Sequence, residues 1–268
     1  MKSSIIEPYA GLFAWIESDL GSTLCLCGQS FRVCGSSSWL EPSNLKFQIS
    51  NRGEASLPMS TTLRPFVRRY TSLPQLLHLL HRRGLTLLDP SRWDDKNDGA
   101  IIEKYRAKMK FTSVLALCFA ESSETYHHWK IYADGVSGVC IEFDKERLID
   151  SIKKTKGLRF GPVDYVKIED LKLYQQKTDR WPFLKRLPYQ GEKEFRLIYE
   201  RKDADPVQSY LVPFSLDAIR RINLSPWIHK TVADAVRETI KTIPGCADLE
   251  VFRTGLVANE RWKNALEL

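Results

Sequence analysis

The pattern of apolar and polar residues changes near residue 58. Before this point serines and asparagines are frequent and no clear periodicity is present. After it, short apolar runs alternate with amphipathic stretches, which is typical of a folded domain. We therefore expect a domain over residues 59–268. We expect residues 1–58 to be a weakly ordered extension, or a translated upstream region with Met59 as the true start.

Within residues 59–268 the pattern predicts both strands and helices. The expected strands are 65–70, 85–88, 113–119, 138–143, 195–199, 210–214 and 249–253, with a weaker extended run at 165–168. The expected helices lie between Ser72 and Gly84, at 101–110, around 126–132, and at 145–154, 216–221 and 228–242; residues 94–99 are expected to form a loop and 171–188 to be irregular or partly helical. Because strands lie near one another in sequence, we predict a single α+β domain with a central, mostly antiparallel sheet.

Polar residues mark where several of these helices begin. Ser72 and Gln75 fit a capping box before an apolar helical face. Ser122 or Ser123 can cap the helix around 126–132, and Asp144 can cap the next one.

Charge and targeting signals restrict the class of protein. The chain has 40 Lys and Arg against 33 Asp and Glu, a formal net charge of +7, which favours anionic partners such as nucleotides or nucleic acid. Such an excess is also typical of a solvated surface. No apolar stretch is long enough to span a bilayer, and residues 1–16 make a poor secretory signal. We expect a cytoplasmic protein that does not enter membranes.

The sequence gives little support for a metal centre. Cys25, Cys27 and Cys34 have no nearby histidine and lack zinc-knuckle spacing, whereas Cys118 and Cys140 lie in apolar runs as small hydrophobic residues. We therefore expect reduced thiols without a bound metal.

Adjacent His127 and His128 point in different directions from a helix, so they are poorly placed to share an ion. Asp94, Asp95 and Asp98 offer closely spaced oxygens, for which turn formation and helix capping are the alternative explanation.

Common catalytic motifs are also absent from the sequence. There is no P-loop, no Gly-x-Gly-x-x-Gly and no nucleophile elbow. This disfavours phosphoryl transfer by a Walker fold and hydrolysis by a catalytic triad.

Three distant runs carry polar residues that can meet in one cleft. Arg69 ends the first, the pair Ser122 and Ser123 follows the second, and the third contains Glu192 and Glu194. If the third run is extended, both glutamates share a face, because consecutive strand side chains alternate. Two carboxylates near a cation suit a site where positive charge develops on a substrate. The alternatives are an arginine paired with a surface acid, serines that cap a helix, and glutamates on an exposed edge strand.

Aromatic residues close in sequence to these runs can complete such a site. Trp129 and Tyr132 follow the serines, and an aromatic wall there would suit a planar nicotinamide or base, although core packing is the commoner role. Together with Arg69 they are candidate cofactor-binding residues, as are Tyr70 and Arg196, which adjoin the polar runs.

Several of these segments resemble a prokaryotic family, domain of unknown function 2971 (DUF2971). Residues 66–70 and 85–95 resemble its opening, 116–119 with 128–144 its most specific stretch, and 189–199 a glutamate-rich motif. The resemblance covers roughly residues 62–245. The sequence departs from the family pattern at Trp93, where Trp-Asp-Asp replaces Phe-Asn-Asp, and at Lys130 and Ile131.

The order arginine, serine, Glu-x-Glu also resembles the arginine-type ADP-ribosyltransferases, and this resemblance concerns arrangement only. It implies NAD as substrate, with Arg69 on the pyrophosphate and Ser122 or Ser123 on the ribose. It further implies Glu194 on the ribose 2′-hydroxyl and Glu192 on the acceptor. The sequence Ser-Ser-Glu at 122–124 departs from that family's Ser-Thr-Ser.

The leading hypothesis is a nucleotide-directed effector, an ADP-ribosyltransferase or NAD glycohydrolase of the toxin or phage-defence type. Its acceptor would be a protein or nucleic acid, and a neighbouring antitoxin or defence partner would restrain or assist it. The alternative is a non-catalytic nucleic-acid-binding or sensor module that uses basic clusters and aromatic side chains. A metal-dependent nuclease, resting on Asp94, Asp95 and Asp98, ranks third.

Overall fold

The computed structural model describes residues 15–17, 23–27, 30–33, 66–202 and 204–265. The chain forms two compact units, Met1–Ser60 and Thr61–Leu268, which are considered separately. In the first, β1 (Trp15–Glu17), β2 (Thr23–Cys27) and β3 (Ser30–Val33) form an antiparallel sheet in sequence order. The side chains of Cys25, Cys27 and Cys34 lie outside the described part of the chain, so their expected reduced, metal-free state stays a prediction.

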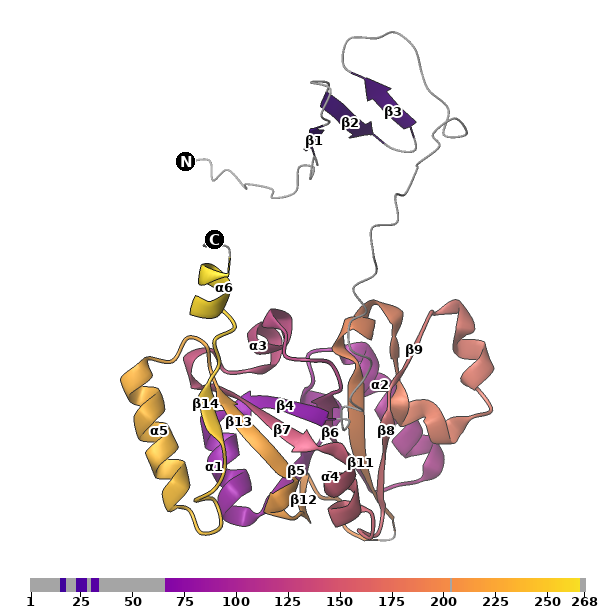
Figure 1. Cartoon of the computed structure of the whole chain (residues 1–268). Coiled ribbons are helices and arrows are strands. Elements are labelled where there is room, and N and C mark those ends of the chain that lie inside the picture. Colours follow the sequence, from indigo (N-terminus) through magenta and orange to yellow (C-terminus); the bar gives the residue numbers. More distant parts are fainter. Residues whose placement is uncertain (1–14, 18–22, 28–29, 34–65, 203, 266–268) are drawn as a thin grey trace, which may run out of the picture. The chain divides into compact units, whose positions relative to one another are not determined.

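The second unit alternates strands and helices, as its sequence pattern predicts (Figure 1). Its strands are β4 (Phe66–Ser72), β5 (Gly84–Leu88), β6 (Ser113–Ala120), β7 (Gly138–Asp144), β8 (Leu158–Pro162), β9 (Asp164–Val166), β10 (Leu184–Arg186), β11 (Glu194–Arg201), β12 (Ser209–Pro213), β13 (Ile219–Leu224) and β14 (Val251–Arg253). Its α-helices are α1 (Leu73–Arg82), α2 (Lys96–Met109), α3 (Tyr126–Tyr132), α4 (Lys145–Ile152), α5 (Lys230–Thr242) and α6 (Glu260–Asn264). Short 3₁₀ helices are η2 (Pro90–Arg92), η3 (Gly135–Ser137), η4 (Glu169–Tyr174), η5 (Thr178–Phe183), η6 (Leu187–Glu192) and η7 (Leu216–Ala218).

A mixed, mostly antiparallel sheet is the centre of this unit, and it confirms the predicted α+β class. The strand order is β12-β5-β6-β4-β7-β13-β14, and β11 pairs with β6 and β8. Within this sheet only β13 and β14 pair in parallel; the separate pair β9 and β10 is also parallel. Figure 1 shows α5 beside the end of the sheet formed by β13 and β14, and α2 beside β6 and β11.

The sheet is joined at its middle by very few backbone contacts. β6 pairs with β11 over its whole length, but with β4 only at Arg68↔Ala120 and with β5 only at Leu88↔Ala116. β4 instead pairs along its full length with β7. The strands β4 and β6 therefore separate after one bridge, and backbone groups at the separation need other partners.

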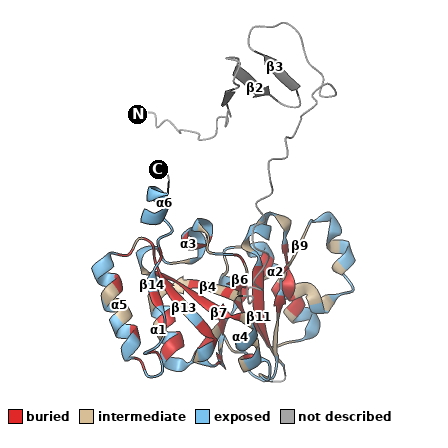
Figure 2. Cartoon of the chain, viewed as in Figure 1, coloured by how far each residue is buried: buried red, intermediate tan, exposed pale blue. Residues whose placement is uncertain are grey.

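The hydrophobic core lies along the strands and the helix faces that cover them (Figure 2). Leu76, Leu79 and Leu80 bury one face of α1, because they recur at helical spacing. In a smaller cluster, Trp129 of α3 packs against Tyr70, Ala120 and Cys140 of the sheet. None of the described helices is long and apolar enough to cross a membrane.

The ends of several helices differ from the prediction. α2 begins at Lys96 rather than near 101, because the Asp95 side chain accepts hydrogen bonds from the amides of Asn97 and Asp98. The predicted loop over 94–99 is therefore wrong for most of its length. Ser72 precedes α1 without the side-chain hydrogen bond that a capping box predicts, and Arg83, in the left-handed region, follows the last residue of this helix.

The predicted helix over 216–221 is also wrong. Only the turn η7 is helical, and the chain continues as strand β13, which pairs with β7 on one side and β14 on the other. A short apolar run does not distinguish a buried strand from a helix, and here the two neighbouring strands decide the outcome. Strand β8, which pairs with β11, was not predicted.

Candidate active site

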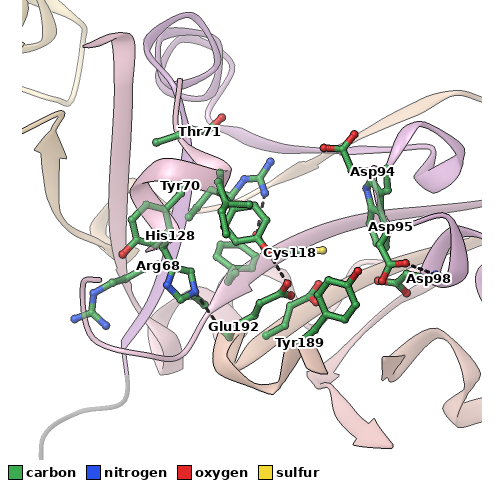
Figure 3. Close-up of a pocket in the computed structure, with 18 of the residues that line it drawn as sticks. Arg68, Tyr70, Thr71, Asp94, Asp95, Asp98, Cys118, His128, Tyr189 and Glu192 are labelled. Carbon is green, nitrogen blue, oxygen red and sulfur yellow. Dashed lines mark hydrogen bonds between the residues drawn. The ribbon is translucent and has the colours of Figure 1, made fainter. Parts of the chain in front are cut away.

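A cavity of about 670 Å³ lies where β4 and β6 separate. Its lining residues come from these two strands, the start of α2, helix α3 and the segment 185–194. Figure 3 shows Tyr70 and His128 on one side of the cavity and the three aspartates of the α2 region on the other. Its size is in the range of small-molecule and cofactor sites.

Arg69 spans the opening between the two strands. Its Nη1 donates a hydrogen bond to the Cys118 carbonyl on β6 at 3.0 Å. Arg69 forms no ion pair with a described residue, and it lines the cavity. Burial lowers the pKa of the guanidinium, although the charge of Glu194 opposes this shift. An arginine remains protonated in proteins, so Arg69 presents a positive charge to a ligand.

Glu194 is the first residue of β11, and two cations hold its carboxylate. Arg196 donates from Nε to Oε1 at 2.7 Å and from Nη2 to Oε2 at 2.9 Å, and Lys185 Nζ lies 3.3 Å from Oε2. Burial raises the pKa of Glu194, but Arg196 and Lys185 outweigh it and lower the pKa to about 2. Glu194 is therefore a fixed negative charge at neutral pH, and it lines the cavity.

Glu192 reaches the same place from a different backbone conformation. It ends η6, and Lys193, at φ 45°, turns the chain before β11 begins. The segment is therefore not extended over both glutamates, and the condition under which strand alternation would place them on one face is not met. The carboxylate of Glu192 nevertheless accepts from Tyr132 Oη at 2.6 Å and from Lys185 Nζ at 2.5 Å. Both glutamates line the cavity and share Lys185 as a partner.

His128 fixes the backbone of Glu192. Its Nε2 lies 3.2 Å from the Glu192 carbonyl oxygen, and its Nδ1 lies 2.6 Å from Thr125 Oγ1. A carbonyl only accepts, so Nε2 carries the proton and the threonine hydroxyl donates to Nδ1. Burial lowers the pKa of His128, which favours this neutral form. Tyr70 stacks on the ring at 5.2 Å between centroids.

The predicted serines do not reach the cavity. Ser122 is 9 % exposed, its carbonyl accepts from Arg68 Nη1 at 2.6 Å, and its hydroxyl is buried without a described partner. Ser123 is exposed, and neither serine lines the cavity. They do not cap α3 either, because Thr125 accepts from the His128 amide in that position. A ribose bound in this cavity would therefore not contact Ser122 or Ser123.

Some of the predicted cofactor-binding residues line the cavity and others are fully buried outside it. Arg69, Tyr70 and Tyr132 line the cavity. Trp129 is fully buried, donates from Nε1 to Glu124 at 2.7 Å and packs edge-on against Tyr70, so it cannot touch a ligand here. Arg196 is also fully buried and acts through Glu194 and Asp98.

Lys185, Trp93 and Tyr189 line the cavity without having been selected from the sequence. Trp93 and Tyr189 stand in segments that resemble the DUF2971 motifs, which was an available signal. Lys185 lies in the polar segment 171–188, where one lysine among several has no distinguishing pattern.

All three aspartates of the α2 region line the cavity, and two of them, Asp95 and Asp98, also have structural roles. Asp95 caps the helix, and both oxygens of Asp98 accept from the Arg196 guanidinium. Among the described residues no group of three or more His, Cys, Asp or Glu side chains is arranged to hold a metal ion. This geometry gives no support to the nuclease alternative.

The comparisons with known proteins agree with part of the sequence interpretation. The model of the family "Protein of unknown function (DUF2971)" matches residues 128–197, the segment that runs from His128 through both glutamates to β11. The resemblance stated from the sequence is confirmed over this segment. A comparison with curated proteins finds no match.

Among solved structures, DarT of Thermus sp. 2.9 is similar. In complex with ADP-ribosylated ssDNA it has a TM-score of 0.39 and 12 % identity, covering 71 % of this chain and 94 % of that chain. In complex with NAD+ it has a TM-score of 0.37 and 12 % identity, covering 71 % of this chain and 96 % of that chain.

Proposed function

We propose that the cavity binds NAD and that the protein cleaves its nicotinamide–ribose bond, as an ADP-ribosyltransferase or NAD glycohydrolase of the toxin or phage-defence type. One observation carries the proposal: the guanidinium of Arg69, which forms no ion pair with a described residue, and the anionic carboxylate of Glu194 line the same cavity. A dinucleotide needs a cation for its phosphates, and departure of nicotinamide needs an anion near the ribose.

Arg69 is the proposed phosphate-binding residue. A guanidinium donates parallel hydrogen bonds to phosphate oxygens, and only one Arg69 nitrogen has a described protein acceptor. Tyr70, Tyr132 and Trp93 add aromatic surface to the cavity, which suits a planar ring.

Glu194 is the proposed residue that stabilises the reacting ribose. When the C1′–N1 bond breaks, its electron pair leaves with nicotinamide and positive charge spreads over C1′ and O4′. Arg196 and Lys185 hold the carboxylate in place, so it would stabilise this charge without reorganising. Glu192 would take the proton of the acceptor as the acceptor bonds to C1′.

Release of nicotinamide from NAD by the purified protein tests this function. We expect Glu194→Gln to lower the rate by about 10²–10³-fold, because a preorganised charge is removed from the transition state. Glu103→Gln is the matched control, since Glu103 pairs with Arg106 on exposed α2 and does not line the cavity. Thermal unfolding would establish that both variants are folded. Equal rates in the native protein and Glu194→Gln would exclude the proposal.

A second candidate function, nucleic-acid binding, is favoured by a cation–aromatic cluster at α3. Lys130 Nζ lies 4.3 Å from the centre of the Trp227 ring and 5.6 Å from that of exposed Tyr126. Basic and aromatic side chains together are typical of single-strand binding sites. The test is an affinity for single-stranded DNA or RNA that falls steeply with salt and with Lys130→Ala, without NAD consumption.

A further inference from the structure

Lys185 occupies the centre of a group of buried charges beside the cavity. It lies on β10, which pairs in parallel with β9 so that Lys185 is opposite Tyr165. The residue is 8 % exposed, and its ammonium contacts Glu192 at 2.5 Å, Glu194 at 3.3 Å and Asp98 at 3.8 Å. Among the described residues no other cation contacts both glutamates.

The two glutamates depend on Lys185 to different degrees. Glu194 keeps a two-point contact with Arg196 if the lysine is removed. Among the described residues, Glu192 would keep only the Tyr132 hydroxyl as a side-chain partner. Asp98 and Glu194 would still contact Arg196, whereas Glu192 would lose the ion pair that it forms with a described residue. Removing one partner of a mostly buried ion pair is unfavourable.

The strand pair that carries Lys185 contacts β11 at a second point. Tyr165 Oη accepts a hydrogen bond from the Glu194 amide at 2.8 Å, just after the left-handed residue Lys193. The pair β9–β10 thus holds the start of β11 through its backbone and through its carboxylate. Glu192, on η6, lies in the connection between β10 and β11.

We propose that Lys185 is a positioning residue that orients the Glu192 carboxylate and fixes the segment 184–193 against Glu194. Its kinetic consequence rests on the proposed function, in which Glu192 acts on the acceptor or on water. The lysine itself forms and breaks no bond. Loss of Lys185 would therefore slow turnover more than substrate binding, because Arg69 and its phosphate contact would be unchanged.

The test uses the full chain with three substitutions. Lys185→Met removes the charge while keeping a long unbranched side chain, Lys185→Arg keeps the charge, and Lys153→Met removes an exposed lysine outside the cavity. Hydrogen–deuterium exchange of peptides from 184–193 measures how firmly this segment is held, and it does not require the protein to cleave NAD. In Lys185→Met we expect exchange to accelerate roughly tenfold, since hydrogen bonds to charged groups are lost. Arginine should restore the slow exchange and Lys153→Met should not change it.

Nicotinamide release from NAD gives the second measurement. We expect Lys185→Met to lower kcat roughly tenfold with a smaller change in KM, and Lys185→Arg to recover most of it. Unchanged exchange in Lys185→Met overturns the proposal whatever the activity. Faster exchange with an unaltered kcat overturns the orienting role of Lys185. Faster exchange in a protein that never cleaves NAD supports the positioning of 184–193 and overturns the proposed function instead.

If Lys185→Met does not fold, Lys185→Gln takes its place in the test. Lys185→Gln keeps N–H donors, without the charge and on a side chain one bond shorter, and its exchange is expected to lie between those of the native protein and Lys185→Met. Exchange equal to the native rate in Lys185→Gln would show that the ammonium charge is not needed and would overturn the proposal.

Discussion

Arg196 lies behind the cavity and binds two buried carboxylates with one guanidinium group. It is fully buried, donates to Glu194 from Nε and Nη2, and binds both oxygens of Asp98. Charges that are removed from water are tolerated only when such partners are present. The carboxylate proposed to face the substrate is thus kept ionised by a residue that the substrate does not touch.

This arrangement predicts how stability depends on pH. The pKa of Glu194 is lowered to about 2 in the folded protein, whereas an unfolded glutamate titrates near its ordinary value of 4.5. A lowered pKa contributes stability that is fully present above the unfolded value and is lost as the pH falls towards the folded value. We expect the free energy of unfolding, measured with urea, to fall by up to about 3 kcal/mol between pH 5 and pH 2 from this group.

The variant Glu194→Gln isolates this contribution, because an amide does not titrate. Its free energy of unfolding should fall less steeply over the same range than that of the native protein. Parallel curves would contradict the lowered pKa. Glu103→Gln serves as the comparison: the hydrogen bond from Arg106 lowers the pKa of Glu103 too, but this pair is largely exposed and screened by solvent, so the variant should flatten the curve less than Glu194→Gln does.

At the scale of single elements, α3 carries side chains to the cavity, and its cap is Thr125 rather than the predicted Ser122 or Ser123. Thr125 accepts a hydrogen bond from the His128 amide and donates its hydroxyl hydrogen to the same residue's ring. His128 in turn holds the Glu192 carbonyl. One cap residue therefore links the start of a helix to the position of a proposed catalytic glutamate.

We expect Thr125→Val to destabilise the protein by about 1 kcal/mol, because the side-chain cap is lost at nearly constant shape. Ser123→Ala is the matched control and should change stability by less than about 0.5 kcal/mol, since Ser123 is exposed and does not cap the helix. Urea unfolding measures both variants. A larger effect from Ser123→Ala would restore the original prediction for the helix start.

Other helices and strands show what the sequence can and cannot predict. Apolar periodicity placed α1, α4, β6 and β7 close to their observed bounds, because each is long enough for its spacing to be distinctive. It failed for 216–221, where a short apolar run becomes a strand only through its two neighbours.

The candidate site follows the same division. From residue type and order we expected Arg69, Glu192 and Glu194 to meet in one cleft, and all three line the cavity. The sequence did not reveal that the hydroxyl of Ser122 is buried inside the protein. Lys185 was missed for a physical reason. Lys185 contacts three carboxylates, which come from α2, η6 and β11. No local pattern of residues predicts that these three elements lie close together.

At the scale of the whole second unit, the cavity lies where strands β4 and β6 of the central sheet separate. β4 is bound to β7 and β6 to β11, and a single bridge joins the two pairs. Arg69 and Glu194 belong to different pairs, so the distance between the proposed phosphate-binding and carboxylate groups is set by this junction. The side-chain bond from Arg69 to the Cys118 carbonyl crosses the same junction.

Within the part of the chain that the structure describes, the buried core of this unit is made by residues after 65, and from it we predict that the unit folds without the preceding segment. All residues of its hydrophobic clusters lie between Val67 and Val251, and residues 61–268 form one compact unit. We expect a fragment that begins at Met59 to unfold cooperatively in urea with a midpoint equal to that of the full chain, because no described core contact is removed.

Nicotinamide release would be measured on the same two proteins, since every residue assigned to the cavity lies within 68–194. Equal rates are expected if the proposed function is correct. A fragment that is unfolded, or that unfolds at a clearly lower midpoint, would show that residues 1–58 contribute to the stability of the domain. Peptides from residues 1–50 in protein made from the native locus, detected by mass spectrometry, would separately exclude Met59 as the true start.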